Sequence, residues 1–172
     1  SVSTCYLLLY VPLADVIITA SDKVCSTTVS PRIKCKDISM GGLRVSSAEM
    51  VRAARARITE IDTPELIGMI DDPDVVIVDL RDIRERHRSG YIPGSFHAPR
   101  GMIEFWVDPD SPYFKEIFGQ DKKFVFHCAS GWRSAITTAT LNDMGFDAAH
   151  LREGFSTWQQ HGGPVEYPDT KG

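Results

Sequence analysis

Short apolar runs separated by polar turns recur along the chain from about residue 57 onward. Residues 75–80 and 123–127 are rich in β-branched and aromatic side chains, and turn-forming residues flank them. This composition predicts buried strands of a parallel sheet, in which both faces are covered. Shorter segments at 57–61, 95–98 and 147–151 predict three further strands.

Helical patterns lie between these predicted strands. Thr63 is the predicted N-cap of one helix, with Pro64 at its first position. The stretch from Ser134 predicts a second helix, which Gly145 ends by taking the left-handed conformation. Residues 155–161 predict a final helix. Strands and helices therefore alternate, which predicts an α/β fold with a mainly parallel central sheet of about five strands and helices on both faces.

The beginning of the chain shows no sustained periodicity, and we expect residues 1–54 to form a flexible or non-native extension. Residues 5–20 are apolar, but Pro12 and Asp15 interrupt them. These interruptions disfavour both a signal peptide and a membrane span. An open alternative is that residues 16–19 add a strand to an edge of the sheet.

We expect residues 55–168 to form a single domain, followed by a short tail at residues 169–172. A length of 172 residues with a hydrophobic fraction of 42% suits one soluble domain with a substantial core. The formal net charge is -4, so the chain lacks the basic field that holds nucleic acid or an anionic membrane. We therefore expect neither of them as a partner.

Four cysteines are present, and Cys128 is the only one within the predicted domain. The others are Cys5, Cys25 and Cys35. The sequence contains no Cys-x-x-Cys pair, and these spacings do not match those of zinc ligands, so we expect no metal site and no cofactor. Free thiols fit a reducing, cytoplasmic compartment.

Cys128 follows the predicted strand 123–127 and precedes the helix that contains Ser134. A loop in this position directs its N–H groups, and the positive end of the following helix, at whatever group the cysteine carries. A helix N-terminus and a nearby cation favour the thiolate form of a cysteine, and Arg133 supplies such a cation. Cys128 is therefore our candidate nucleophile. The strand–loop–helix pattern leaves the alternative of a buried core cysteine equally open.

The seven residues from Cys128 to Ser134 read Cys-Ala-Ser-Gly-Trp-Arg-Ser. They resemble the active-site loop of the rhodanese superfamily, which runs Cys-x-x-Gly-x-Arg-Ser. Upstream, Asp79-Leu-Arg81 followed by Glu85 is similar to the Asp-x-Arg-x-x-x-Glu motif of the same family.

Two further blocks carry the resemblance, each with a departure from the family pattern. Residues 90–95 resemble Gly-His-Ile-Pro-Gly-Ala, but Tyr91 replaces the histidine and Ser95 replaces the alanine. Residues 153–158 resemble the closing Gly-Gly-x-x-x-Trp motif, with Glu153 where the first glycine usually stands. The resemblance covers roughly residues 57–165 and does not extend to the first part of the chain.

The resemblance implies the rhodanese fold, with the strand before Cys128 at its centre. It also implies a single-domain thiosulfate sulfurtransferase. In such an enzyme the cysteine takes a sulfane sulfur from thiosulfate or a related donor and carries it as a persulfide to cyanide or a thiol. The expected partners are therefore a small-molecule sulfur donor, a cyanide or thiol acceptor, and a sulfur-accepting protein.

The resemblance also assigns roles to individual residues. The expected catalytic residues are Cys128 and Arg133. The expected substrate-binding residues, whose N–H groups or side chains would face the persulfide, are Ala129, Ser130, Gly131, Trp132 and Ser134. A buried hydrogen-bonded network beneath the loop is expected from Asp79, Arg81 and Glu85, because unpaired charges there would be costly.

Two rival functions remain open at this point. Cysteine phosphatases and arsenate reductases also use a cysteine, a loop of N–H groups and an arginine, but their pattern has five residues between Cys and Arg. Only four residues separate Cys128 from Arg133, which favours sulfur over phosphate. The other rival is a non-catalytic interaction or sulfur-carrier module, against which the presence of both residues argues.

Overall fold

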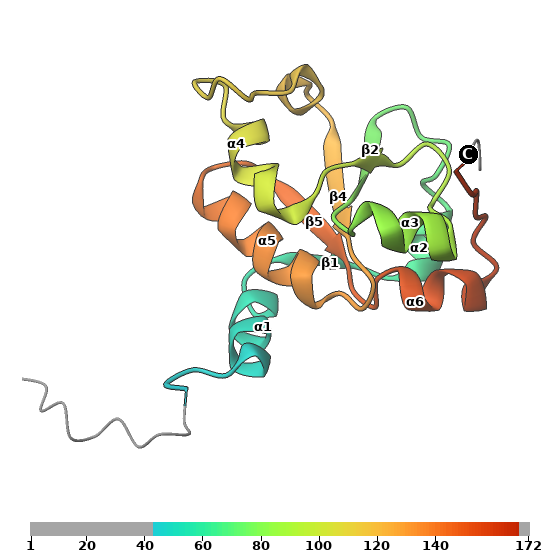
Figure 1. Cartoon of the computed structure of the whole chain (residues 1–172), viewed down its shortest axis with the longest axis horizontal. Helices are drawn as coiled ribbons and strands as arrows, with labels where there is room; N and C mark the ends of the chain where they lie inside the picture. Colours follow the sequence, from blue (N-terminus) through green and yellow to red (C-terminus); the bar gives the residue numbers. More distant parts are fainter. Residues whose placement is uncertain (1–42, 169–172) are drawn as a thin grey trace, which may run out of the picture. The chain divides into compact units, whose positions relative to one another are not determined.

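The structure is a computed structural model that describes residues 43–168. One five-stranded sheet lies at its centre, with the strand order β1-β5-β4-β2-β3. Its strands are β1 (Thr59–Ile61), β2 (Val75–Asp79), β3 (Phe96–His97), β4 (Lys123–His127) and β5 (Ala148–Leu151). Every pairing in the sheet is parallel, and β4 is the middle strand. The predicted parallel α/β sheet, centred on the strand before Cys128, is confirmed (Figure 1).

Helices connect the strands and cover both faces of the sheet. They are α1 (Ser47–Arg55), α2 (Thr63–Ile67), α3 (Ile83–Ser89), α4 (Ile103–Val107), α5 (Trp132–Asp143) and α6 (Phe155–Trp158). Short 3-10 helices occur at η1 (Arg100–Met102), η2 (Glu116–Gly119) and η3 (Gln159–His161).

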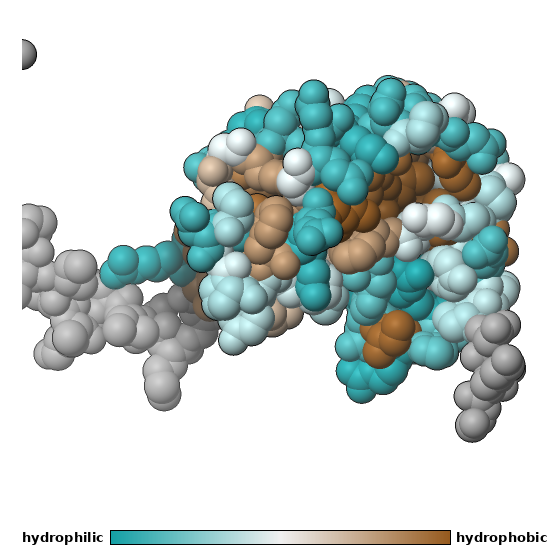
Figure 2. Space-filling view, turned by 90° about the horizontal axis from the view of Figure 1, so that it is seen from above, coloured by the Kyte–Doolittle hydropathy of each residue, from teal (hydrophilic) through white to brown (hydrophobic). Residues whose placement is uncertain are grey.

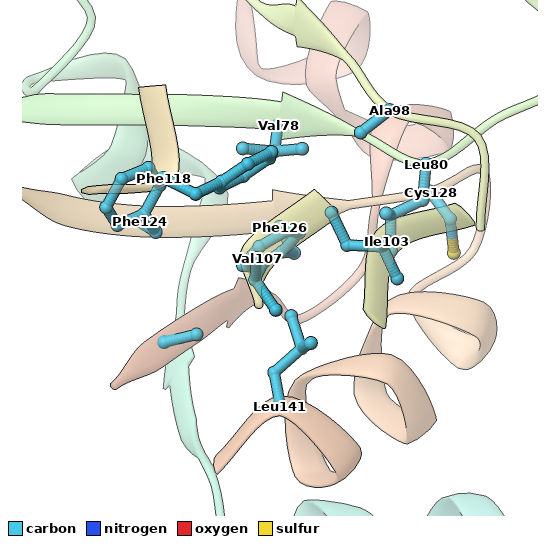
Figure 3. Close-up of a cluster of buried hydrophobic side chains, with 11 residues drawn as sticks. Val78, Leu80, Ala98, Ile103, Val107, Phe118, Phe124, Phe126, Cys128 and Leu141 are labelled. Atoms are coloured by element: carbon cyan, nitrogen blue, oxygen red, sulfur yellow. The ribbon is translucent and has the colours of Figure 1, made fainter. Parts of the chain in front are cut away.

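The side chains of β4 alternate between two hydrophobic clusters, one on each face of the sheet. Phe124 and Phe126 pack with residues of α4, η2 and α5 in the first cluster, which Figure 3 shows. Val125 points the other way and packs with residues of α2 and α6 in the second cluster. Because successive side chains of a strand point to opposite faces, the apolar run in β4 fits a strand that is buried on both sides.

Helix α1 lies within the segment that the sequence predicts as an extension. Its buried residues Val51 and Ala54 pack against Ala135 and Ala139 of α5. Residues 47–54 therefore belong to the folded unit, which begins at Leu43, and the domain starts earlier than residue 55. The expectations for residues 1–42 and 169–172, including the alternative edge strand, lie outside the described residues.

Helix boundaries differ from the predicted ones by one or two residues. Asp62, not Thr63, is the N-cap of α2, and its side chain makes no capping hydrogen bond. Helix α5 begins at Trp132, two residues before Ser134, so the loop after Cys128 is shorter than expected. Gly145 takes a φ of 90° just after α5 and confirms the predicted helix end.

The surface is mostly hydrophilic on the face that Figure 2 shows, apart from a hydrophobic area with hydrophilic borders. Within residues 43–168, no helix is long and apolar enough to cross a membrane.

Candidate functional site

The loop between β4 and α5 is short and sharply turned. Cys128 directly follows β4, and Gly131 is the N-cap of α5 with a left-handed φ of 77°. A Cβ atom at Gly131 would lie 2.1 Å from the carbonyl oxygen of Arg152. Glycine is therefore required here for two reasons, its backbone conformation and its close approach to the segment after β5.

Cys128 is fully buried, with 0% of its surface exposed. It lies at one end of the hydrophobic cluster in Figure 3, so it does contribute to the core. Its sulfur also accepts hydrogen bonds from Ser134, with the Sγ atom 3.5 Å from the backbone nitrogen and 3.6 Å from the hydroxyl oxygen. The two interpretations of Cys128 are therefore compatible: its side chain packs in the core, and its sulfur lies close to the start of a helix.

Arg133 lies close enough to Cys128 to interact with it electrostatically, but its main partner is Glu85. The Nη1 and Nη2 atoms each donate to one carboxylate oxygen of Glu85 at 2.7 Å. The hydrogen bonds from Arg133 are the largest cause that lowers the pKa of Glu85, and the same pair raises the pKa of Arg133. The guanidinium of Arg133 is thus held in place by a bidentate ion pair.

Glu85 is positioned by the start of α3. Asp82 is the N-cap of this helix and accepts a hydrogen bond from the N–H of Arg84. Glu85 accepts one from the N–H of Asp82, at 3.0 Å, which completes a capping box. One carboxylate therefore both fastens the helix start and holds the arginine of the loop.

Asp79 and Arg81 form a separate buried pair after β2, with 0% and 1% of their surfaces exposed. Arg81 donates from Nη2 to Asp79 at 2.7 Å and to the carbonyl oxygen of Gly90 at 2.8 Å. Its guanidinium also lies 3.9 Å from the ring centre of Phe155. Arg81 thus ties β2 to the end of α3 and to α6, which is a structural role.

The pKa of Asp79 reflects this pairing. Burial raises it, while the charge of His127 and the hydrogen bonds from Arg81 lower it, and the balance brings the pKa to about 2. Burial lowers the pKa of His127 to about 4, so this histidine is uncharged at neutral pH. Under those conditions the charged groups next to Asp79 are Arg81, which donates hydrogen bonds to it, and Arg86, whose Nη1 lies 3.6 Å from Oδ2.

The structure brings the two predicted catalytic residues together, but it divides the expected network. Glu85 pairs with Arg133, whereas Asp79 pairs with Arg81. Within residues 43–168 the sulfur of Cys128 accepts hydrogen bonds from Ser134 and from none of the other four expected binding residues, Ala129, Ser130, Gly131 and Trp132. Trp132 is about half exposed, with 48% of its surface accessible.

Sequence reasoning missed two residues near the sulfur. His150 of β5 lies 3.2 Å from the hydroxyl oxygen of Ser134 through Nδ1, and Glu60 of β1 lies 2.8 Å from its Nε2. Two features of the sequence could have indicated them: a charged residue, Glu60, in the first predicted strand, and a polar residue, His150, in the apolar last strand. They could not be interpreted because the pairing of β1 with β5 is not visible in a single sequence.

A cavity of about 380 Å³ lies at the opposite end of the sheet from Cys128. Its lining includes Thr59, Lys123 and Ala148, the first residues of β1, β4 and β5. Cys128 follows the carboxyl end of β4, where open α/β sheets place their ligands. The chemistry of this loop therefore has no relation to that cavity.

Comparison with known proteins places this arrangement in a family. The family described as "Rhodanese-like domain" matches residues 62–161. The chain is 30% identical over 100 residues to the mouse thiosulfate sulfurtransferase/rhodanese-like domain-containing protein 3, a match that covers 55% of this chain and 64% of that protein. It is 31% identical over 103 residues to YtwF of Bacillus subtilis (strain 168), which is provisionally named a sulfurtransferase, covering 59% of this chain and 91% of YtwF.

A solved structure from Rhodopseudomonas palustris CGA009 is also similar, with 48% identity and a TM-score of 0.70. The match covers 73% of this chain and 97% of that one, which is described as a protein of unknown function and possible tyrosine phosphatase. The family match extends over more than half of the chain and contains the loop, the buried Asp79–Arg81 pair and α6. This chain belongs to the family of rhodanese-like domains.

Proposed function

We propose that this protein is a sulfurtransferase that moves a sulfane sulfur from thiosulfate or a related donor to cyanide or a thiol through a persulfide on Cys128. The observation that carries the proposal is the setting of the sulfur. Cys128 Sγ receives two hydrogen bonds from Ser134 near the start of α5 and interacts electrostatically with the guanidinium of Arg133. Donors and a cation around one sulfur stabilise negative charge such as that of the persulfide anion formed by the transfer.

In the proposed reaction the Cys128 thiolate attacks the outer sulfur of thiosulfate. A sulfur–sulfur bond forms to Cys128, and the sulfur–sulfur bond of the donor breaks. Sulfite leaves with the bonding electron pair, and the acceptor later attacks the outer sulfur of the persulfide and frees the Cys128 thiolate. Two easier transfers thereby replace one difficult transfer.

Access to the sulfur requires a movement in the loop, because Cys128 is fully buried. Trp132 and Arg133, the first residues of α5, are the large side chains after Cys128 that are partly exposed, with 48% and 37% exposure. We infer that a donor reaches Cys128 by displacing these side chains. The loop N–H groups of Ala129, Ser130 and Gly131 would then face the second sulfur atom rather than Sγ itself.

A phosphatase is the second candidate, because the similar Rhodopseudomonas palustris protein is described as a possible tyrosine phosphatase. Four residues separate Cys128 from Arg133, and α5 already begins at Trp132. This leaves a tighter loop than the five-residue spacing with which cysteine phosphatases hold a tetrahedral oxyanion. The spacing therefore favours sulfur transfer.

One pair of assays separates these functions. The wild-type chain and the Cys128→Ser variant are assayed for thiocyanate formed from thiosulfate and cyanide, and for hydrolysis of p-nitrophenyl phosphate. We expect Cys128-dependent thiocyanate formation and negligible phosphate hydrolysis. Hydrolysis that depends on Cys128 without thiocyanate formation would reverse the assignment, and inactivity in both assays would favour an interaction module.

The physiological setting is part of the proposal. A thiol of a small molecule or of a sulfur-accepting protein is the proposed acceptor in the cell. The reaction needs Cys128 as a free thiol, which a reducing compartment maintains, so we propose a cytoplasmic location.

A further inference from the structure

A chain of hydrogen bonds runs from the sulfur of Cys128 across two strands to the surface. The Ser134 hydroxyl oxygen is 3.6 Å from Cys128 Sγ and 3.2 Å from His150 Nδ1. His150 Nε2 is 2.8 Å from Glu60 Oε1. Three elements supply these groups, namely α5 for Ser134, β5 for His150 and β1 for Glu60.

One end of this series of hydrogen bonds is buried, and the other end reaches solvent. Cys128, Ser134 and His150 are each 0% exposed, whereas the side chain of Glu60 is 21% exposed. The thiol of Cys128 therefore has no direct contact with solvent, but the last member of the chain does. A proton that leaves the thiol needs a route through the protein, and this series of hydrogen bonds supplies one.

The direction of the hydrogen bonds follows from Glu60. Its carboxylate lies 3.5 Å from Nε of Arg55 and 3.3 Å from Nε of Arg152, so it forms ion pairs with two guanidinium groups. An ionised carboxylate only accepts hydrogen bonds, so His150 Nε2 carries the proton that it donates to Glu60. The Nδ1 atom of an uncharged His150 is then an acceptor for the single proton of the Ser134 hydroxyl. Before the transfer that hydroxyl oxygen accepts from the Cys128 thiol, and after the transfer the hydroxyl donates to the thiolate.

Burial and two nearby guanidinium groups favour the uncharged form of His150 before the reaction. Burial is the largest cause that lowers the pKa of His150, and the charges of Arg55 and Arg152 lower it further. The hydrogen bond to Glu60 and its charge raise the pKa, but by less. At the Cys128 end of the series, the charged group that interacts with the sulfur is Arg133. His150 is therefore in the form that accepts a proton.

We propose that Ser134, His150 and Glu60 form a proton relay that deprotonates Cys128. The proton of the thiol passes from Sγ to the hydroxyl oxygen of Ser134, while the proton of that hydroxyl passes to Nδ1 of His150. Cys128 becomes a thiolate and His150 an imidazolium, whose charge the carboxylate of Glu60 offsets. No bond between heavy atoms changes in this step, and no electrons leave or enter.

The relay deepens the proposed function, because it explains how a buried cysteine becomes a nucleophile. His150 and Glu60 act through Ser134 and touch neither the donor nor the transferred sulfur, so they are positioning residues. Glu60 lies outside the part of the chain that matches the family, residues 62–161. The last member of the relay therefore comes from β1, which precedes the matched segment.

Asp62 offers a matched control for Glu60. It lies two residues further along and is also paired with Arg152, at 3.0 Å, but the hydrogen-bond partner of His150 Nε2 is Glu60 and not Asp62. Replacing either carboxylate by its amide removes one charge from the same cluster. Only the change at Glu60 removes the charge that offsets an imidazolium at His150.

The test is the pH dependence of Cys128 alkylation by iodoacetamide, followed peptide by peptide with mass spectrometry. We expect Glu60→Gln and His150→Gln each to raise the pH of half-maximal alkylation rate by about one unit, and Asp62→Asn to leave it unchanged. Thermal unfolding of every variant shows whether the fold is retained. Equal profiles for Glu60→Gln and Asp62→Asn would overturn the relay.

A double variant separates a relay from a merely structural role. If Glu60 acts through Ser134, adding Glu60→Gln to Ser134→Ala should produce no further shift, whereas independent effects would add. Additive shifts would therefore count against the relay, even if His150→Gln fails to fold. Alkylation needs no sulfur donor, so shifted profiles in a chain that does not use thiosulfate would support the relay and remove only the proposed function.

Discussion

The guanidinium of Arg133 donates to both carboxylate oxygens of Glu85, at 2.7 Å each. The resemblance alone predicts Arg133 as a catalytic residue, and its planar guanidinium suits the oxygens of an anionic donor. In the structure that fork already has a carboxylate partner, so Arg133 presents its charge to Cys128 while Glu85 fixes its orientation. This pairing could not be read from the sequence, because the two residues belong to different helices, α3 and α5.

Replacing Arg133 by lysine separates its charge from its geometry. Arg133→Lys keeps a cation beside Cys128 but loses the bidentate pair with Glu85. We expect kcat/KM for thiosulfate to fall by about 1–3 kcal/mol in transition-state terms, the worth of a charge-assisted hydrogen bond. The rate of iodoacetamide alkylation should fall less, because a positive charge and the start of α5 both remain.

The Glu85→Gln variant is the matched control, because it weakens the same pair from the other side. Similar losses of kcat/KM in both variants would show that the pair's geometry matters. Equal losses in kinetics and alkylation for Arg133→Lys would mean that Arg133 acts only through the thiolate. Unchanged values in both assays would remove Arg133 from the site.

His127 should make the stability of the fold depend on pH. It is 0% exposed, neither ring nitrogen has a hydrogen-bond partner in the described residues, and its pKa is lowered by burial from 6.5 to about 4. As the pH falls, the unfolded chain therefore takes up a proton before the folded chain does. The contribution of His127 to the free energy of unfolding, about 3 kcal/mol, is complete above about pH 6.5 and is lost as the pH falls toward 4.

Denaturant unfolding between pH 7 and pH 4 measures this effect. The His127→Leu variant should show a flatter dependence of the free energy of unfolding on pH than the wild type. Replacement of the exposed His161 by glutamine is the control for loss of a surface histidine. A slope in His127→Leu as steep as that of the wild type would show that His127 is not the group that titrates.

At the scale of elements, the active loop is fastened to the start of α6. The N–H of Phe155 donates to the carbonyl oxygen of Cys128 at 2.8 Å, and that of Ser156 donates to Ala129 at 2.8 Å. Gly154 directly precedes these two donors, as the N-cap of α6, and has a left-handed φ of 69°. The closing motif, residues 153–158, thus holds the loop in position. The family pattern contains this glycine, but the sequence alone does not show why it is needed.

A side chain at Gly154 should displace the loop. Its Cβ would lie 2.7 Å from the carbonyl oxygen of Cys128 and 2.7 Å from the nitrogen of Gly131. We therefore expect Gly154→Ala to reduce thiocyanate formation more than tenfold, roughly the effect of misplacing a reacting group by a fraction of an ångström. Steady-state kinetics and thermal unfolding of the same samples measure activity and fold together.

Gly94→Ala is the control for backbone strain alone. Gly94 has a φ of 71°, close to that of Gly154, but a Cβ there would meet nothing within 4 Å. Both variants carry the cost of a left-handed alanine, and only one of them presses on the loop. Equal losses of activity in the two variants would contradict the positioning role of Gly154.

For the whole molecule, much of the architecture follows from the sequence, and the polar contacts within it do not. The apolar runs of β2 and β4 predict a buried parallel sheet because their composition suits two covered faces, and the structure confirms this. Helix α1 escapes prediction because it buries only Val51 and Ala54. The series of hydrogen bonds from Ser134 to Glu60 cannot be predicted from the sequence, because it requires β1 and β5 to be neighbours in the sheet.

The central claim is that Cys128 carries the transferred sulfur, and intact-protein mass spectrometry tests it most directly. After incubation with thiosulfate, we expect the mass of one added sulfur atom, which peptide mapping places on Cys128. Cyanide should then remove that atom and yield an equal amount of thiocyanate. A chain that gains no sulfur, or a Cys128→Ser variant that gains as much as the wild type, would contradict the account.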